Sequence, residues 1–209
     1  MLSLQSFRKS YANHLVLEIP ELTFSKGTHW IKGKNGSGKS TLFNCIAGLT
    51  PFEGQILLND IALNEKPGEY KLLVNYSASE PVFPEFLTGV DLINYFSKLK
   101  KASHEEVKAL ASLLEVDVYA GQPCGSYSSG MMKKLSILLA FLGDPEWIIL
   151  DEPLITLDHR AQNIVTRLIL DKKKEGVSFL FATHQDFENA VIQPTDIYEV
   201  YSKTLNKVV

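Results

Sequence analysis

Residues 33–41 read Gly33-Lys34-Asn35-Gly36-Ser37-Gly38-Lys39-Ser40-Thr41. This segment matches the phosphate-loop pattern G-x-x-x-x-G-K-[S/T], which requires a strand before it and a helix after it. Both are expected here, because His29-Trp30-Ile31 is typical of a short buried strand and residues 42–49 have the pattern of a helix. The segment therefore predicts an α/β fold with a phosphate-binding loop, and the context disfavours a chance glycine-rich loop.

The residue types in this loop suit a nucleoside triphosphate. Glycines let the backbone N–H groups approach phosphate oxygens, and the start of the following helix adds partial positive charge. Lys39 is expected to neutralise the β- and γ-phosphates, and the Ser40 hydroxyl to ligate Mg²⁺. The candidate nucleotide-binding residues are Gly33, Lys34, Asn35, Gly36, Ser37, Gly38, Lys39, Ser40 and Thr41.

A pair of carboxylates, Asp151-Glu152, follows the apolar run Trp147 to Leu150. Open α/β sheets place their ligands at the carboxyl ends of strands, so the pair should face the phosphate loop. We expect Asp151 to hold Mg²⁺, through water, and Glu152 to orient or deprotonate an attacking water. The catalytic candidates from the residues themselves are thus Lys39 and Glu152.

Hydrophobic periodicity outlines the rest of the fold. Fully apolar strands that alternate with helices imply a mostly parallel sheet covered on both faces. A capping box formed by Ser103 and Glu106 should open one of the helices. We expect strands near 15–19, 29–31, 55–58, 71–76, 147–150 and 177–181, and helices near 42–49, 90–99, 103–114 and 161–174.

Composition narrows the possible functions. A length of 209 residues and 45% apolar residues suit one domain over 1–209. A net charge of −3 argues against nucleic acid as a partner. Cys45 and Cys124 have no metal-like spacing, which indicates a reducing compartment. We find neither a signal peptide nor an apolar run long enough to span a bilayer, so a membrane role would need a partner.

Three further motifs follow in order and narrow the class. Tyr127-Ser128-Ser129-Gly130-Met131 precedes an apolar helix, residues 152–158 read Glu-Pro-Leu-Ile-Thr-Leu-Asp, and Thr183-His184 follows a buried strand. With the phosphate loop, they resemble the signature, the D-loop and the switch histidine of ABC transporter ATP-binding subunits. The signature resembles the Leu-Ser-x-Gly-Met form of some exporters. Tyr11 stands where this family places an aromatic residue that stacks on adenine.

The resemblance implies a phosphate-loop NTPase core, an N-terminal antiparallel β subdomain and an inserted helical subdomain over about 85–142. It also implies ATP and Mg²⁺ as cofactors and hydrolysis within a head-to-tail dimer with a second nucleotide-binding subunit. Ser128 and Gly130 would then contact the γ-phosphate in trans. His184 would hold the γ-phosphate or the water, and Asp158 would cross the interface. A separate transmembrane permease would hold the subunit on the cytoplasmic face of the membrane, where it would drive transport, with export favoured.

One position departs from the family pattern. The family places a glutamine after the strand near 71–76, where it contacts Mg²⁺ and the membrane partner, but this chain has Ser77-Ala78-Ser79-Glu80. We expect Ser79 to replace the glutamine as a Mg²⁺ ligand through water, with Ser77 and Glu80 as the alternatives. Tyr127 in place of leucine is expected to be tolerated.

Other interpretations remain open at this point. A soluble ABC ATPase acting on ribosomes or chromosomes usually has two cassettes or a coiled-coil insert, and this chain has neither pattern. A non-hydrolysing partner subunit would explain the altered glutamine position, but Lys39, Asp151, Glu152 and His184 argue for hydrolysis. The apolar loop with Phe83, Phe86 and Leu87 could receive a coupling helix of the permease or pack locally.

Overall fold

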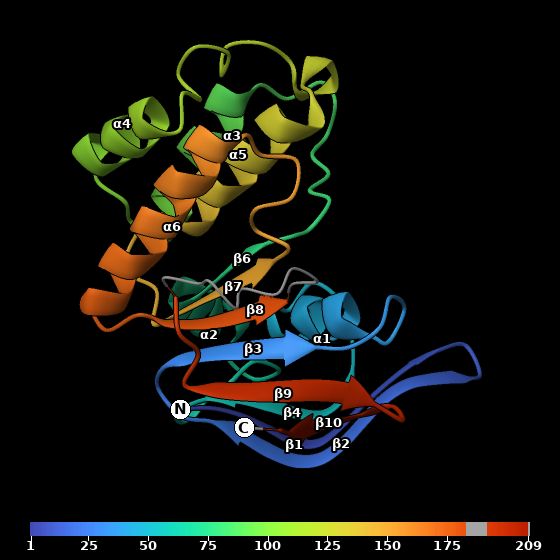
Figure 1. The fold of residues 1–209 in the computed structure, drawn as a ribbon. Coiled ribbons are helices and arrows are strands. Elements are labelled where there is room, and N and C mark those ends of the chain that lie inside the picture. Colours follow the sequence, from blue (N-terminus) through green and yellow to red (C-terminus); the bar gives the residue numbers. More distant parts are fainter. Residues whose placement is uncertain (183–191, 209) are drawn as a thin grey trace.

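The computed structural model describes residues 1–182 and 192–208. It consists of two sheets and a group of helices, with the larger sheet between the helices and the smaller sheet (Figure 1). The expected α/β fold, with a mostly parallel sheet, an N-terminal antiparallel sheet and a helical part in the middle of the chain, is confirmed.

The larger sheet has six strands in the order β10-β9-β3-β8-β7-β6. Neighbouring strands from β9 to β6 run parallel, and only the edge pair β10–β9 is antiparallel. Its strands are β3 (Thr28–Lys32), β6 (Val74–Ser77), β7 (Trp147–Asp151), β8 (Ser178–Ala182), β9 (Asp196–Tyr201) and β10 (Thr204–Lys207). β7 and β8 are buried at every residue, which explains why apolar residues predominate in both.

The smaller sheet is antiparallel, in the order β2-β1-β4-β5. Its strands are β1 (Leu2–Tyr11), β2 (His14–Phe24), β4 (Glu53–Leu58) and β5 (Ile61–Ala62). Buried and exposed residues alternate along β1 and β2, as expected for a sheet with one face on the core. Helix α1 (Lys39–Ile46) packs between the two sheets and carries Leu42, Phe43, Cys45 and Ile46 into the core.

Residues 71–76 do not form one strand, which corrects the expectation from sequence. The first half belongs to helix α2 (Pro67–Leu73), and only β6 (Val74–Ser77) is extended. Pro67 lies in the first turn, where a helix loses no hydrogen bond to proline, and Tyr70 anchors the helix in the core. The apolar run 72–74 therefore spans a helix end and a strand start, which periodicity over six residues cannot separate.

The helices between β6 and β7 are α3 (Gly89–Lys100), α4 (His104–Leu113), the 3₁₀ turn η1 (Cys124–Ser126) and α5 (Ser129–Ala140). A capping box begins α3, through Thr88 and Asp91, and not α4. Ser103 does accept a hydrogen bond from Glu106 N at 3.1 Å. The Glu106 carboxylate instead accepts from Gly143 N at 2.9 Å, so only half of the expected box forms.

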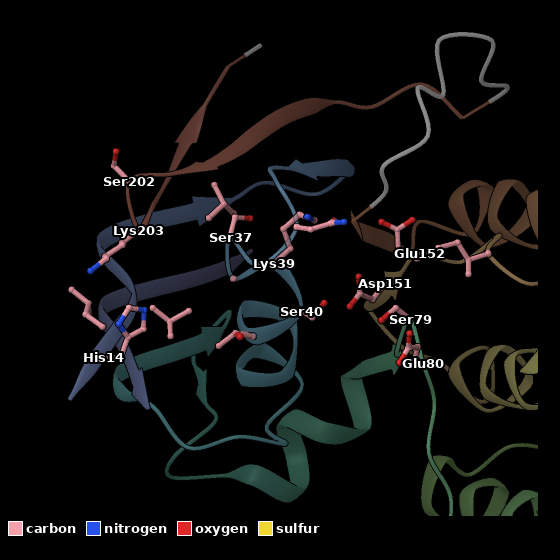
Figure 2. A pocket seen from close by; sticks show the side chains of 18 residues that line it. His14, Ser37, Lys39, Ser40, Ser79, Glu80, Asp151, Glu152, Ser202 and Lys203 are labelled. Atoms are coloured by element: carbon pink, nitrogen blue, oxygen red, sulfur yellow. The ribbon is translucent and has the colours of Figure 1, made fainter. Parts of the chain in front are cut away.

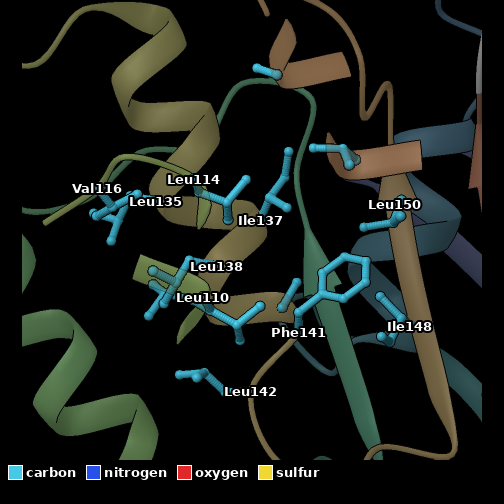
Figure 3. Packing of buried hydrophobic residues seen from close by; sticks show 14 of the residues in the cluster. Leu110, Leu114, Val116, Leu135, Ile137, Leu138, Phe141, Leu142, Ile148 and Leu150 are labelled. Atoms are coloured by element: carbon cyan, nitrogen blue, oxygen red, sulfur yellow. The ribbon is translucent and has the colours of Figure 1, made fainter. Parts of the chain in front are cut away.

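Buried side chains form two clusters on opposite faces of the larger sheet. Trp147 and Ile149 of β7 face the smaller sheet and α1, whereas Ile148 and Leu150 face the helices. Figure 3 shows the helical side, where Ile137 and Phe141 of the α5 region lie toward Ile148 and Leu150, while Leu135 and Leu138 lie toward Val116 and Leu110. Helix α6 (His159–Lys174) covers the same face through Ala161, Val165 and Ile169.

Three apolar side chains of α3 face outward. Val90, Tyr95 and Leu99 are 43%, 63% and 44% exposed, while Leu92 and Ile93 provide the buried face. No helix in the described part of the chain is both long and apolar enough to cross a bilayer.

Candidate functional site

A cavity of about 830 Å³ opens at the carboxyl ends of the parallel strands. The phosphate loop and the start of α1 form one wall, and the ends of β6 and β7 form another (Figure 2). Its polar lining includes Asn35, Ser37, Lys39, Ser40, Thr41, Ser79, Glu80, Asp151 and Glu152. The structure thus brings together the phosphate loop and the carboxylate pair, which are far apart in the sequence.

The loop has the backbone shape of an anion cradle. Gly36 and Gly38 have φ values of +74° and +110°, in the region that side-chain-bearing residues rarely adopt. No atom lies within 4 Å of a Cβ built on Gly36, so the loop is open on that side. The Ser37 Oγ atom is buried and has no hydrogen-bond partner among the described residues. These features fit a phosphate group, which would bring acceptor oxygens to this hydroxyl and to the loop N–H groups.

Lys39 lies under the loop with 7% of its surface exposed. Its Nζ donates to the carbonyl oxygens of Gly33 and Lys34, at 2.7 and 3.2 Å. Burial lowers its pKa, and the negative charges of Glu152 and Asp151 oppose that shift. The ammonium is therefore held close to the place where phosphates would lie, with carboxylates across the cavity.

Asp151 and Glu152 are buried at the end of β7, with 2% and 7% exposure. Glu152 has a φ of +48°, an uncommon backbone conformation for a residue with a side chain. Its N–H donates to the Ala182 carbonyl at 2.9 Å, which ties this strained turn to β8. Figure 2 shows the Ser40 and Asp151 side chains turned toward one another and Ser79 beside them.

The structure separates the three candidates for the missing glutamine. Ser79 and Glu80 both line the cavity, on the segment that leaves β6. Ser77 does not: its hydroxyl is fully buried and shares a hydrogen bond with the Ser136 hydroxyl at 2.9 Å. Ser79 and Glu80 therefore stay available for a water-mediated metal contact, and Ser77 is occupied in the core.

Magnesium would have an oxygen-rich site here. The described residues contain no cluster of three or more His, Cys, Asp or Glu side chains with metal-ligand geometry. Mg²⁺ does not need such a cluster, because this ion is usually held by one or two carboxylates together with phosphates and water. The hydroxyl of Ser40 and the carboxylate of Asp151 provide such a donor set next to the loop.

The opposite end of the cavity contains residues that the sequence did not single out. His14, Leu15, Val16, Val200, Ser202 and Lys203 line it. His14 begins β2 directly after the β1–β2 turn, and Lys203 lies in the β9–β10 turn; Figure 2 shows both at one end of the cavity. The sequence around these residues does not indicate a functional role, because only the tertiary structure brings the C-terminal hairpin to the cavity.

Tyr11, expected to stack on adenine, does not line this cavity. It pairs with His14 across the β1–β2 turn, is 50% exposed, and has Lys9 Nζ 4.3 Å from its ring centre. Cross-strand partners share one face of a hairpin, so Tyr11 lies beside a lining residue. Its role in adenine binding stays a prediction.

Ser128 and Gly130 line a different cavity, of about 590 Å³, with Glu115, Tyr119, Met131, Lys134, Thr156, Leu157 and Asp158. The Ser128 hydroxyl caps α5 by accepting from Met131 N at 3.2 Å. Asp158 caps α6 in the same way, by accepting a hydrogen bond from Ala161 N at 2.8 Å. This structural role was not among the roles expected for Asp158 from the sequence. Neither signature residue lines the Lys39 cavity of the same chain.

Tyr127, the unusual first residue of the signature, has a local structural role. Its hydroxyl accepts from Gly89 N at 3.1 Å and donates to the Tyr119 carbonyl at 3.2 Å. Tyr119 in turn donates to the Met131 carbonyl at 2.9 Å. These bonds tie the signature segment to the start of α3. His184, expected to contact the γ-phosphate, lies outside the described residues.

Comparisons with known proteins agree with this geometry. The family model of ABC transporters matches residues 17–155. The chain is 31% identical to the ABC transporter ATP-binding protein NatA of Bacillus subtilis (strain 168), over 78% of this chain and 69% of NatA. It is 28% identical to the molybdate/tungstate import ATP-binding protein WtpC of Pyrococcus abyssi (strain GE5 / Orsay), over 99% of this chain and 65% of WtpC.

Other relatives are much longer. The chain spans 8% of ATP-binding cassette sub-family A member 7 of Rattus norvegicus, with 29% identity over 85% of its own length. Among solved structures, the ATP binding subunit of an ABC transporter superimposes with a TM-score of 0.87 at 25% identity, covering 100% of this chain and 90% of that one. The phosphate loop, the carboxylate pair and these matches lead to one assignment: the chain belongs to the ABC transporter family, as an ATP-binding domain.

Proposed function

We propose that this chain binds Mg-ATP, hydrolyses it as one half of a dimer of nucleotide-binding subunits, and thereby drives an ABC transporter. The observation that carries the proposal is the convergence of Lys39, Ser40, Asp151 and Glu152 on one cavity. Phosphoryl transfer needs positioning and electrostatic stabilisation more than covalent chemistry, and these four side chains provide both.

Each side chain has a definite task in this proposal. Lys39 exchanges its loop carbonyls for β- and γ-phosphate oxygens. Ser40 and Asp151 hold Mg²⁺, which when bound neutralises charge on the phosphates. Glu152 accepts a hydrogen bond from the attacking water and orients it toward the γ-phosphate. Ser79 or Glu80 completes the metal surroundings through water.

The nucleoside end of the cavity would hold ribose and adenine. Tyr11 remains the proposed stacking residue, and its neighbour His14 and the turn residue Lys203 lie where they could add contacts. Stacking of a base on an aromatic side chain contributes about 1–3 kcal/mol. His184 remains the proposed γ-phosphate contact.

Hydrolysis would require a second subunit. Ser128 and Gly130 line their own cavity at the start of α5, away from the phosphate loop of the same chain. A helix N-terminus with a serine hydroxyl favours an anion, so the signature of one subunit would cover the γ-phosphate held by the other. Completion of the site only in the dimer would link chemistry to assembly.

The membrane partner would dock beside the nucleotide site. An apolar groove of about 320 Å³ lies between β6 and the helices and includes Val82, Phe83, Phe96 and Leu139. Val82 and the nearby Phe86 are 88% and 81% exposed, so they add apolar surface at the edge of the groove. We assign this groove to a segment of a transmembrane permease, which would place the chain on the cytoplasmic face of the membrane. The Ser-x-Gly-Met form of the signature favours export.

Two experiments test the proposal. The parent protein, at high concentration, should hydrolyse ATP in a Mg²⁺-dependent way, and Lys39→Ala should lose ATP binding. Absence of hydrolysis by a protein that still binds ATP would favour a non-hydrolysing partner subunit. Affinity purification from detergent-solubilised membranes should recover a polytopic protein; recovery of ribosomal or chromosomal proteins alone would contradict the transport role.

A further inference from the structure

Lys133 is a fully buried lysine near the start of α5, with 0% of its surface exposed. Its Nζ donates to the carbonyls of Ala78 at 2.7 Å and Asp151 at 2.8 Å, with a longer contact of 3.5 Å to the Ser79 carbonyl. Lysine is almost never buried to this extent without strong partners, because removing an ammonium from water is costly. Here all the partners are backbone oxygens at the metal end of the nucleotide cavity.

The two short bonds join strand ends that the sheet itself no longer joins. β6 and β7 are paired in parallel as far as Ser77 and Leu150. The next residues along each strand are Ala78 and Asp151, and the ammonium of Lys133 bridges their carbonyls. The side chain thus continues the connection between β6 and β7 one step beyond the last pair of the ladder.

The two carbonyls belong to the peptide bonds that lead into proposed site residues. The Ala78 carbonyl shares its peptide plane with Ser79 N, and the Asp151 carbonyl shares its plane with Glu152 N. The Asp151–Glu152 peptide is held at both ends. Its oxygen accepts a hydrogen bond from Lys133 Nζ, and its N–H donates to the Ala182 carbonyl, 2.9 Å away. Glu152 needs such support because its φ of +48° is strained.

We propose that Lys133 is a positioning residue for the metal end of the site: its ammonium fixes the Ala78–Ser79 and Asp151–Glu152 peptides and so orients the side chains that receive Mg²⁺ and the attacking water. This inference rests on the proposed function of that site. Lys133 touches neither nucleotide nor metal; it acts through the backbone.

The position of Lys133 on α5 gives this role a second consequence. Ser128, the cap of the same helix, lies five residues before it. A rigid helical turn therefore connects the signature segment, which would contact the partner's nucleotide, to the metal end of this chain's own site. A shift of α5 would move the ammonium and the two peptides with it.

Electrostatics explains why a charged group is retained. Burial lowers the pKa of Lys133 to about 8, and the charges of Asp151 and Glu152 oppose the shift. The carboxylates therefore stabilise the ammonium behind them, and the ammonium offsets their mutual repulsion. A neutral side chain of the same length would fill the space but supply neither the donors nor the charge.

The test compares Lys133→Met with Lys100→Met. Lys100 is a suitable control because it is a part-buried lysine that, like Lys133, donates to backbone carbonyls, here those of Lys71 and Val74, and burial lowers its pKa to about 8 as well. It does not line the Lys39 cavity. It borders the apolar groove assigned above to the permease, but assays on the isolated subunit contain no permease. Both substitutions should lower the free energy of unfolding, so Lys100→Met controls for the general effect of removing a lysine that donates to backbone carbonyls.

The readout is the affinity of a fluorescent ATP analogue, measured with Mg²⁺ and with EDTA, together with the Mg²⁺ concentration for half-maximal ATPase rate. Lys133→Met should keep the EDTA affinity but need about 10- to 100-fold more Mg²⁺, the usual effect of losing a group that orients metal ligands. Lys100→Met should show the parent's Mg²⁺ dependence. A folded Lys133→Met protein with the parent's Mg²⁺ dependence would overturn the inference.

Lys133→Arg provides the same test if Lys133→Met does not fold. The planar guanidinium keeps charge and donors but cannot meet the same carbonyls in the same geometry. Its Mg²⁺ requirement should rise above that of the parent, because groups that orient metal ligands are sensitive to geometry. A parental value would contradict the inference. Failure of the parent to bind ATP, or unchanged binding in Lys39→Ala, would instead contradict the proposed function.

Discussion

Replacement of Tyr127 by phenylalanine tests the role assigned to the unusual first residue of the signature. The change removes only the hydroxyl, which accepts from Gly89 N at 3.1 Å and donates to the Tyr119 carbonyl at 3.2 Å. The backbone of Gly89 is buried, so its N–H would lose its partner without gaining water. The ring itself would still fill its space.

The expected cost follows from these two bonds. A buried donor left unsatisfied costs about 1–3 kcal/mol, and this range applies to Tyr127→Phe. For a chain of this length, 1 kcal/mol shifts the melting temperature by roughly 2–4 °C, so Tm should fall by about 2–12 °C. Urea denaturation followed by circular dichroism gives the free energy of unfolding directly.

Tyr95→Phe is the matched control for this experiment. The Tyr95 ring is 63% exposed on α3, and no hydrogen bond of its hydroxyl is recorded in the described part of the chain. Surface changes of this kind usually stay within about 0.5 kcal/mol. If Tyr127→Phe proved as stable as Tyr95→Phe, the hydrogen bonds that tie the signature to α3 would not contribute as argued.

Three further predictions concern the site and the buried lysines. Glu152→Gln should keep the parent's ATP affinity but hydrolyse ATP about 100-fold more slowly or worse, since a general base contributes at least that factor. The ATP-bound dimer should then accumulate and be seen by size-exclusion chromatography. A variant that stays monomeric with ATP and is as active as the parent would rule out the role assigned to Glu152. Ser79→Ala should raise the Mg²⁺ concentration needed for half-maximal ATPase rate, and an unchanged rate and Mg²⁺ dependence would leave Glu80 as the candidate. The pKa values of Lys100 and Lys133 are lowered from 10.5 to about 8 in the folded chain, so the unfolded chain binds more protons above pH 8. The free energy of unfolding should therefore rise with pH from about 8 to 9.5, by at most about 1.4 kcal/mol per pH unit for each lysine, and urea titrations of Lys133→Met should show a smaller slope than those of the parent.

The parts of the site that the sequence predicted are those encoded locally. The phosphate loop carries its glycines, its lysine and its serine within nine consecutive residues of the sequence, 33–41. The carboxylate pair directly follows a strand whose apolar residues are consecutive because both faces of the sheet are covered. Short-range patterns of this kind identify a strand end, and strand ends determine where the ligand lies.

The features that were missed depend on contacts between distant segments. Nothing in the sequence singles out Lys133, since its partners Ala78 and Asp151 are 55 and 18 positions away. Lys203 reaches the nucleotide cavity only because β10 lies beside the N-terminal strands. Only half of the capping box expected for α4 forms, for a similar reason: the Glu106 carboxylate accepts a hydrogen bond from Gly143 N, 37 positions away.

The division of the core by β7 has a consequence for how the chain opens. Alternate residues of this strand enter two apolar clusters: Trp147 and Ile149 join α1 and the small sheet, and Ile148 and Leu150 join α5 and α6. The helical half can therefore lose its packing while the half that carries the phosphate loop remains closed. Amide hydrogen exchange under native conditions should then show two levels of protection, and a nucleotide should slow exchange mainly in α1, β3 and the small sheet.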